Sequence, residues 1–579
     1  MNISLIFLIA SSLVSFLCGM AGFHIAGPEE SLSTKLYLTL QLFTFESGNV
    51  DRPVPLFLDI ARWLAPATTL GSLFAAAHTY FHGVWGRLRL LFARDHIIIC
   101  GGGSKGSLLA EELVEREGLL VVIEKDPANV ALGSLRKKGA VVITGDAGFP
   151  DVLREARIQE AKTLVCLAGD DRTNLGIAMA AAGQIDAGRE NNPLQIHVHI
   201  ADVAHRNILQ RNRALDITNE RHHQIRTFNY FTNRARVAFK HLPLNWEPAQ
   251  GSADKAKLIV GTVGPLERAI LVQAAHIGHF PHGERVSIHL VSPTAEADKK
   301  NLVKDYPGFE ICAPIHATKL DIAADFTEAV VKITEHDGSD VLTTVLMTDH
   351  EVESAFVGAL LLGEKLRGEQ RYRIVLDAPE HHGIKKVLQT GHDDRKRKLS
   401  TFIELLPGFS IACGHEAVFS ESLDTIAMKI HDTWFKETQT KIADAEKSGN
   451  HAEAKKHREK DTFKFWSELS EEQKDVNRLA ADHLEIKARS VDMDPNDPKL
   501  LAKWNNLSDD QLEMLSRVEH ERWAAPLWMA GWQKGANDQG KTDYSRRLHP
   551  NLVAYDALDE GTKKYDRDQV RKTAEYLYQ

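Results

Sequence analysis

The stretch from Asp95 to Gly106, Asp-His-Ile-Ile-Ile-Cys-Gly-Gly-Gly-Ser-Lys-Gly, constrains the fold of this chain more than any other feature. An apolar strand runs directly into a Gly-x-Gly-x-x-Gly loop, in which backbone amides at a helix N-terminus cradle phosphate. A helix is expected over 107–117, and a second strand over 119–124 ends in Glu124. A carboxylate at this spacing hydrogen-bonds ribose hydroxyls and repels a 2′-phosphate. The segment therefore predicts a Rossmann-like domain that favours NAD, ATP or ADP over NADP.

Two uncharged segments precede this domain. Residues 3–26 and 63–85 contain no Asp, Glu, Lys or Arg, and each is long enough to span a bilayer as a helix. A cleaved signal peptide is the alternative for the first, but it lacks a basic n-region. Arginines follow the second segment, while the loop between the two is acidic. The positive-inside rule then predicts a multi-pass protein of the bacterial inner membrane with residues 87–579 in the cytosol.

Residues 33–44, between the two spans, are apolar but too short to cross the bilayer. Such segments persist at membrane depth only when they are buried in protein or line an aqueous path. The layout of helix, short helix, glycine-containing loop and helix predicts a re-entrant pore segment. Its candidate pore residues are Thr44, Phe45, Glu46, Ser47 and Gly48.

A ring of Glu46 side chains in a symmetric oligomer would favour cations. The alternative is an extracellular amphipathic loop with Glu46 on its surface. The potassium filter Thr-Val-Gly-Tyr-Gly is absent, so the sequence does not predict potassium selectivity. In the second span Ala67, Gly71 and Ala75 recur every four residues, which favours close helix packing, with a gating hinge at Gly71 as the alternative.

Strands expected at 141–144, 163–168 and 196–200 continue the βαβ alternation. Together with the glycine loop, this region resembles the regulator-of-potassium-conductance (RCK) domain, also called the TrkA N-terminal domain. The resemblance covers residues 96 to about 245 and rests on the glycine loop, Glu124-Lys-Asp-Pro127, Gly145-Asp146 and Ala168-Gly-Asp-Asp-Arg-Thr-Asn174.

The resemblance implies a cytosolic gating module that pairs with copies of itself, in a homotetramer, and binds an adenine nucleotide or NAD(H). A Rossmann domain that keeps the shape and binds nothing is the alternative. The implied nucleotide-binding residues are Gly101, Gly103, Ser104, Lys105, Gly106, Glu124, Asp146 and Asp170.

A second unit of the same kind is expected over 256–430. Gly261-Thr-Val-Gly264 follows a strand, and further strands are expected at 286–291, 341–347 and 372–376. The third glycine position holds Leu266, and the second strand ends in Ser292-Pro293 instead of an acid. This copy therefore resembles a degenerate RCK domain with a structural or interfacial role.

The C-terminal quarter begins with a charged segment, 431–461, that predicts a solvated helical linker. Residues 462–579 resemble the RyR domain of ryanodine receptors, through His520-x-x-Trp523, Gly531-Trp532, His549-Pro550 and Tyr565-Asp-Arg567. Tryptophan faces and arginines suit an unknown nucleotide-like ligand, although a small helical core with internally paired charges is the alternative. The candidate ligand residues are Arg517, Glu519, His520, Arg522, Trp523, Trp532, Tyr565, Asp566 and Arg567.

These expectations combine into one architecture: a two-helix pore domain (1–92), a first RCK domain (95–245), a second (256–430), the linker and a mainly α-helical RyR domain. The net charge of −9 and the absence of a basic stripe exclude a nucleic-acid partner. The five cysteines form no CxxC pair, so neither a metal site nor a disulfide framework is expected.

The leading function is a ligand-gated ion channel in the lipid bilayer. Potassium is the family expectation for the permeating ion, and nucleotide ligands open or close the pore. The pairing of domains also suggests nucleotide-signalled antiviral defence. The alternatives are a membrane-anchored regulatory subunit of a separate transporter and an NAD-dependent membrane oxidoreductase. No acid/base constellation follows the Rossmann unit, so an enzyme is not expected.

Overall fold

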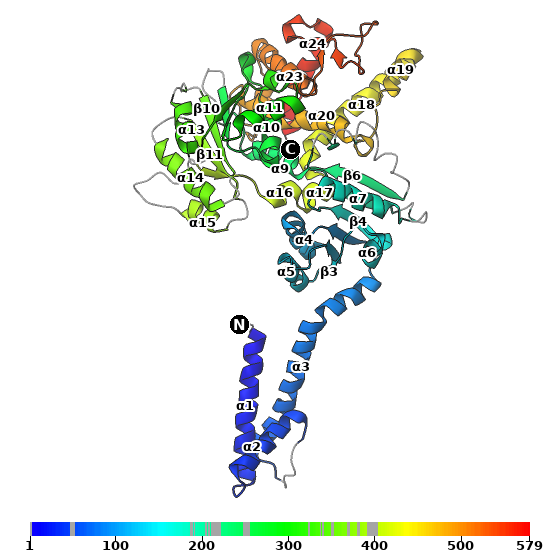
Figure 1. Cartoon of the computed structure of the whole chain (residues 1–579). Helices are drawn as coiled ribbons and strands as arrows, with labels where there is room; N and C mark the ends of the chain where they lie inside the picture. The colour runs from blue at the N-terminus through cyan, green and yellow to red at the C-terminus, as the bar shows by residue number, and fades with distance from the viewer. Residues whose placement is uncertain are drawn as a thin grey trace. The chain divides into compact units, whose positions relative to one another are not determined.

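The computed structural model describes two compact units, residues 1–93 with 132–142 and residues 94–131 with 143–579 (Figure 1). The described residues are 3–46, 53–185, 189, 192–202, 205–206, 209, 222–246, 255–321, 325–335, 337, 341–348, 352–366, 371–378, 382–390 and 403–578. For residues 3–6, 75–87, 382 and 389–390 the description is limited to the backbone.

The N-terminal unit is helical. Its helices are α1 (Ile3–Ala26), α2 (Leu32–Gln41), the 3-10 turn η1 (Leu42–Thr44) and α3 (Leu56–Leu91). Small residues let the helices approach closely, because a Cβ on Gly22 would lie 2.6 Å from the backbone nitrogen of Leu58. A Cβ on Gly71 would lie 3.4 Å from Leu8, so Gly71 faces α1 and supports the packing role.

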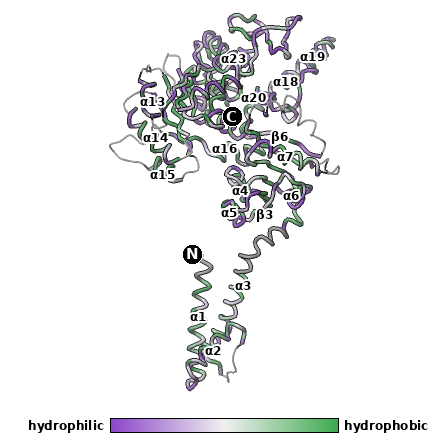
Figure 2. The backbone as a smooth tube through the Cα atoms, viewed as in Figure 1, coloured by the Kyte–Doolittle hydropathy of each residue, from purple (hydrophilic) through white to green (hydrophobic). Residues whose placement is uncertain are grey.

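One helix among the described residues is long and apolar enough to cross a bilayer, over Phe7–Ala26 (Figure 2). The second expected span, 63–85, falls within the 36-residue helix α3, which contains Pro66, and it stays a prediction. The short segment between them is helical, as expected. The side chain of Ser31 caps α2 by accepting a hydrogen bond from Thr34 N.

The first sheet has six strands in the order β3-β2-β1-β4-β5-β6. Its strands β1 and β2 are almost continuous runs of buried Ile, Val and Leu, as expected for strands covered on both faces of a parallel sheet. The strands are β1 (His96–Cys100), β2 (Leu120–Glu124), β3 (Val141–Thr144), β4 (Ala161–Cys166), β5 (Leu194–His199) and β6 (His223–Phe228). The helices are α4 (Ser104–Arg116), α5 (Ala131–Lys138), α6 (Pro150–Glu155), α7 (Asp171–Ala182) and α9 (Tyr230–His241).

The second sheet has the order β12-β11-β10-β7-β8-β9, which repeats the topology of the first. Its strands are β7 (Lys255–Val260), β8 (Ser287–Ser292), β9 (Ile315–Lys319), β10 (Val341–Met347), β11 (Tyr372–Leu376) and β12 (Ile403–Leu405). Its helices are α10 (Pro265–Ile277), α11 (Ala295–Asp305), α12 (Phe309–Cys312), α13 (Phe326–Thr334), α14 (Val352–Lys365) and α15 (His382–Thr390). The prediction of two Rossmann-like sheets is confirmed.

The remainder is mainly helical. Two short helices, α16 (Phe409–Cys413) and α17 (His415–Phe419), follow the second sheet and pack against α4 and α9. The later helices are α18 (Thr425–Lys447), α19 (His451–Arg458), α20 (Glu471–Asp482), α21 (Leu484–Arg489), α22 (Leu500–Trp504), α23 (Asp509–Met529), α24 (Glu560–Arg571) and α25 (Thr573–Leu577).

The segment expected to be a solvated linker differs from that expectation. Helix α18 begins at Thr425, before residue 431, and buries one face that includes Ile430, Thr438 and Ile442. Ile442 packs in a small apolar cluster with Ala454 of α19 and Phe463. The apolar positions are too widely spaced among Lys and Glu for periodicity to reveal this face.

The C-terminal helices share a hydrophobic core with the second sheet. One cluster of buried residues joins Phe280, Phe309 and Cys312 of the second domain to Ala525 and Met529 of α23. The Cys312 thiol lies 3.5 Å from the carbonyl of Ala525, which accepts its hydrogen bond. The C-terminal region is therefore packed onto the second domain through an apolar contact.

Gly308 makes this contact testable, because a Cβ there would overlap the carbonyl of Trp528. We expect G308A to destabilise the packing of α23 by about 1–3 kcal/mol, as overpacking does. The measurement is thermal unfolding together with limited proteolysis between the second domain and α23. G118A is the matched control, since a Cβ at Gly118 meets nothing within 4 Å. Equal stability of the two variants would contradict the contact.

Candidate functional site

The glycine loop connects β1 to α4 with a geometry that depends on two of its glycines. Gly101 has φ +103°, and a Cβ there would lie 2.7 Å from the carbonyl oxygen of Leu167. A Cβ on Gly106 would overlap the carbonyl of Gly101. Gly103 caps α4 and has open space around its Cα. The loop thus turns tightly and leaves backbone free at the N-terminus of α4, where a phosphate would lie.

Glu124 ends β2 and faces this loop. Its Oε2 accepts a hydrogen bond from Gly102 N at 2.5 Å, and its Oε1 accepts one from Asp126 N at 2.9 Å. The carboxylate therefore holds the loop closed while its remaining lone pairs stay open to ribose hydroxyls. Asn129, which the sequence did not reveal, donates to the carbonyl of Gly102 at 2.7 Å.

Two more carboxylates border the same space. Asp146 accepts from Lys125 Nζ at 2.9 Å, and this hydrogen bond lowers the pKa of Asp146. Asp170 caps α7 by accepting from the backbone N of Thr173 at 2.9 Å, which lowers its pKa. Both carboxylates are therefore anionic at neutral pH.

These residues line a cavity of about 480 Å³ at the carboxyl ends of β1, β2 and β4. The volume falls within the ~300–1,000 Å³ typical of ligand pockets. The position is the switch point between β1 and β4, where open α/β sheets bind ligands. Seven of the eight predicted residues line the cavity: Gly101, Gly103, Ser104, Lys105, Glu124, Asp146 and Asp170. Gly106 lies beneath, against Gly101.

Lys105 lies at the cavity wall, but its ammonium points onto aromatic rings. Its Nζ is 4.7 Å from the ring centroid of Phe231 and 5.6 Å from that of Tyr230, both at the start of α9. Burial lowers the pKa of Lys105. The ammonium of Lys105 is thus stabilised by cation–π contacts, in the place of the carboxylate partner that a partly buried lysine usually has.

The corresponding loop of the second domain is occupied by the protein itself. Gly264 caps α10, and its N–H donates to Glu267 Oε2 at 2.9 Å. The Glu267 side chain is buried, so its carboxylate takes the amide that a phosphate would use. This arrangement supports the structural role that the sequence predicted for the second domain.

The predicted C-terminal ligand residues form internal ion pairs. Glu519 is buried between Lys487, whose Nζ lies 2.8 Å from Oε2, and Arg522, whose Nη2 lies 2.7 Å from Oε1. Burial alone would raise the pKa of Glu519, but the charges of Arg522 and Lys487 outweigh it and hold that pKa well below its usual range. These two predicted residues thus stabilise one another together with Lys487.

Among the other predicted residues of this domain, His520, Trp523 and Asp566 lie together, and the rest contact other side chains or solvent. The side chain of His520 contacts Asp566 Oδ2 at 3.2 Å and the carbonyl of Val553 at 3.0 Å, and its ring stacks on Trp523. Arg517 pairs with Asp556, Arg567 with Glu513 and Glu560, and Trp532 packs edge-on against Tyr544, while Tyr565 is exposed. Ligand binding by this set stays a prediction.

The pore candidates lie on the N-terminal unit. Thr44 donates to the carbonyl of Gln41, Phe45 has φ +67°, and the carboxylate of Glu46 accepts from Gln41 Nε2 at 3.0 Å. Ser47 and Gly48 lie outside the described residues. The pore role of these residues stays a prediction.

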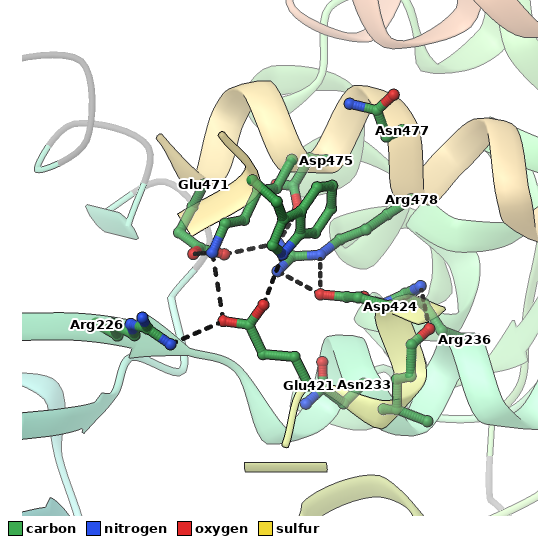
Figure 3. A network of polar contacts seen from close by, with 12 residues as sticks. Arg226, Asn233, Arg236, Glu421, Asp424, Glu471, Asp475, Asn477 and Arg478 are labelled. Atoms are coloured by element: carbon green, nitrogen blue, oxygen red, sulfur yellow. Dashed lines mark hydrogen bonds and ion pairs between the residues drawn. The ribbon is translucent and has the colours of Figure 1, made fainter. Parts of the chain in front are cut away.

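A buried ion network that the sequence did not reveal joins the first domain to α20 (Figure 3). Arg236 of α9 donates to Asp424 at 2.7 Å and to Asp482 at 2.8 Å. Arg478 of α20 bridges Asp424 at 2.7 Å and Glu471 at 2.6 Å. Burial alone would raise the pKa of Glu471, but Arg478 and Lys474 lower it to about 2. Arg226 of β6 pairs with Glu421 at 3.1 Å.

Comparison with known proteins identifies two domains in this chain. Residues 97–220 match the model of the TrkA-N domain, and residues 502–579 match the model of the RyR domain. These matches confirm the two resemblances found in the sequence.

Among similar proteins, Potassium channel protein 1 of Methanocaldococcus jannaschii is 32% identical over 127 residues, covering 20% of this chain and 37% of the relative. The Trk system potassium uptake protein TrkA of Vibrio alginolyticus is 36% identical over 86 residues, covering 15% of this chain and 18% of the relative. The chain thus spans well under half the length of these relatives. A solved structure of GsuK bound to ADP covers 70% of this chain and 94% of its own, at 15% identity and a TM-score of 0.35.

We expect E124A to weaken ADP or NAD binding by about 10- to 100-fold, since it removes the ribose acceptor and frees the Gly102 amide. Calorimetry on the full chain in detergent measures the affinity. E115A, on the same domain but outside the cavity lining, is the control. Unchanged affinity in E124A would show that the ligand does not use this carboxylate.

We expect E519Q to destabilise the C-terminal region by about 3 kcal/mol, because Lys487 and Arg522 would stay buried without their counter-charge. Since the folded pKa of Glu519 is lowered, its stabilisation is present above the ordinary Glu pKa of about 4.3 and is lost as pH falls further. Thermal unfolding from pH 8 to pH 3 measures both effects. D568N removes an exposed pair with Arg571 and should cost under about 1 kcal/mol.

Proposed function

We propose that this chain, which carries a TrkA-N domain and an RyR domain, is the subunit of an oligomeric, nucleotide-gated cation channel. An adenine nucleotide or NAD(H) binds the cavity of the first sheet, and the C-terminal domain receives a second, nucleotide-like ligand. Potassium is the proposed permeant ion and a homotetramer the proposed assembly. Residues 87–579 are proposed to lie in the cytosol, and the function includes no chemical step.

The cavity at the ends of β1, β2 and β4 carries this proposal. It combines the free backbone of Gly103, the helix N-terminus of α4 and the carboxylate of Glu124. These groups match the phosphate and ribose of one nucleotide. Asp146 and Asp170 add negative charge at the rim, which disfavours a ligand with an additional phosphate on its ribose.

Covalent continuity supports a gating role. Helix α3, which contains the proposed second span, ends at Leu91, and β1 begins at His96. Only Phe92 to Asp95 therefore connect this helix to the strand that enters the glycine loop. A ligand that binds one conformation of this domain more tightly would shift the population of that conformation. The same differential affinity is the free energy available to open or close a pore.

A regulatory subunit of a separate transporter is the second candidate. One observation favours it: similarity to a Trk system potassium uptake protein TrkA. In this case the N-terminal helices serve as an anchor. The potassium pathway would then belong to another protein.

Flux from liposomes that contain only this protein separates the two candidates. We expect potassium efflux to change at least about fivefold on addition of ADP or NAD, a typical coupling. E124A should lose the response, and E115A should keep it. Nucleotide binding without flux under any nucleotide would favour the regulatory subunit, whereas no binding at all would reject the nucleotide site.

A further inference from the structure

Helix α9 contacts three parts of the second compact unit through successive side chains. Its first turn, Tyr230 and Phe231, receives the ammonium of Lys105 from the cavity wall. Arg234 donates to Asp377, at the end of β11 in the second sheet, at 3.2 Å. Arg236 donates to Asp424 and to Asp482, the last residue of α20. One rigid helix thus carries contacts to the proposed nucleotide site, to the second sheet and to the C-terminal region.

Among these contacts, the one between Lys105 and the aromatic rings of α9 is the contact that a bound ligand would change. Among the residues that the structure describes, none forms a hydrogen bond or ion pair with its ammonium, which lies over Phe231 instead. Its side chain also lines the cavity, at the first turn of the helix whose N-terminus faces it. A phosphate in the cavity would be a stronger partner for the ammonium of Lys105 than an aromatic ring is, because the phosphate and the ammonium carry opposite charges. The ammonium would then leave the rings of α9.

The C-terminal half of α9 cannot move without breaking contacts, because the side chain of Arg236 is held in place by two carboxylates. Arg236 is buried and lies about 9 Å along the helix from Tyr230, at 1.5 Å per residue. Its guanidinium is fixed by Asp424 and Asp482, and Asp482 also accepts from Gln273 Nε2 at 2.8 Å. Asp424 is shared with Arg478 of α20 (Figure 3). Movement of α9 therefore requires the network with α20 to rearrange.

We propose that the ammonium of Lys105 pairs with the phosphate of the bound nucleotide, and that the resulting shift of α9 alters the position of α20 through Arg236. The inference rests on the proposed nucleotide site and adds its regulation. By linkage, a ligand that shifts α20 from the C-terminal side must alter nucleotide affinity by the same factor. The two proposed ligand sites are thereby coupled within one chain.

Hydrogen–deuterium exchange on the full chain in detergent tests this coupling with the wild-type protein. Saturating ADP or NAD should change amide exchange at least about threefold in α9 and α20, and leave α24 unchanged, because exchange reports local opening. Adenosine, which has no phosphate, should leave α20 unchanged even where it binds.

Two variants separate Lys105 from a general effect of cavity charge. K105M keeps the length and apolar stem of the side chain, and at saturating ADP it should show no change in α20. K125M removes another positive charge from the lining of the same cavity. In the described part of the chain the ammonium of Lys125 pairs with Asp146, whereas that of Lys105 lies over the aromatic rings of α9, so in K125M α20 should still respond at saturation.

The outcomes are distinct. Binding of ADP or NAD to the wild type without a change in α9 and α20 overturns the coupling and leaves the nucleotide site intact. A response in K105M equal to that of the wild type, or an equal change in α24, also overturns the coupling. Failure of the wild type to bind either nucleotide rejects the proposed site and this inference together.

Discussion

The guanidinium of Arg236 is the interaction on which the arrangement of the second unit depends. It joins α9 to Asp424 and Asp482, which lie 188 and 246 residues further along the chain. Burial alone would lower the pKa of Arg236, but these two carboxylates raise it. A buried cation of this kind is tolerated only when its partners are in place. The packing of α9 in the first domain and the packing of α20 against it therefore depend on the same set of buried charges.

Much of the first domain follows from its sequence, because its signals are local. The strands that enclose the cavity are continuous apolar runs, and the glycine loop has fixed spacing to Glu124. Strands β6, β9 and β12 were missed: His223-Gln-Ile-Arg-Thr-Phe228 and Ile315-His-Ala-Thr-Lys319 are at least half polar, and β12 has three residues. Strands that are polar or very short give no clear apolar run, and they are recognised only once neighbouring strands pair with them. The N-terminal short helix was likewise predictable from length and polarity.

The direction of side chains was not predictable. Lys105 was predicted to be one of the nucleotide-binding residues, yet its ammonium lies over the ring of Phe231, which is more than a hundred residues away in the sequence. Asn129 and Arg236 gave no signal, since their partners are brought close only by the tertiary fold. In the C-terminal domain, charged residues beside tryptophans suggested a ligand surface, with a helical core of internally paired charges as the alternative. Glu519 and Arg522 fit that alternative, because they lie buried on α23 and pair with each other and with Lys487. Lys487 itself gave no signal in the sequence.

The two sheets share a topology but differ at the N-terminus of the helix that follows their first strand, which is α4 in the first sheet and α10 in the second. In the second copy Glu267 reaches back to the amide of Gly264, so the chain carries its own anion where a duplicated phosphate site would otherwise remain. A free nucleotide would have to expel a buried carboxylate before it could bind there. The two sheets thus share a framework, but the amide at the first helix of the second sheet is already satisfied from within the chain. Under the proposed function, the two sheets together supply one nucleotide site per chain, and that site lies in the first sheet.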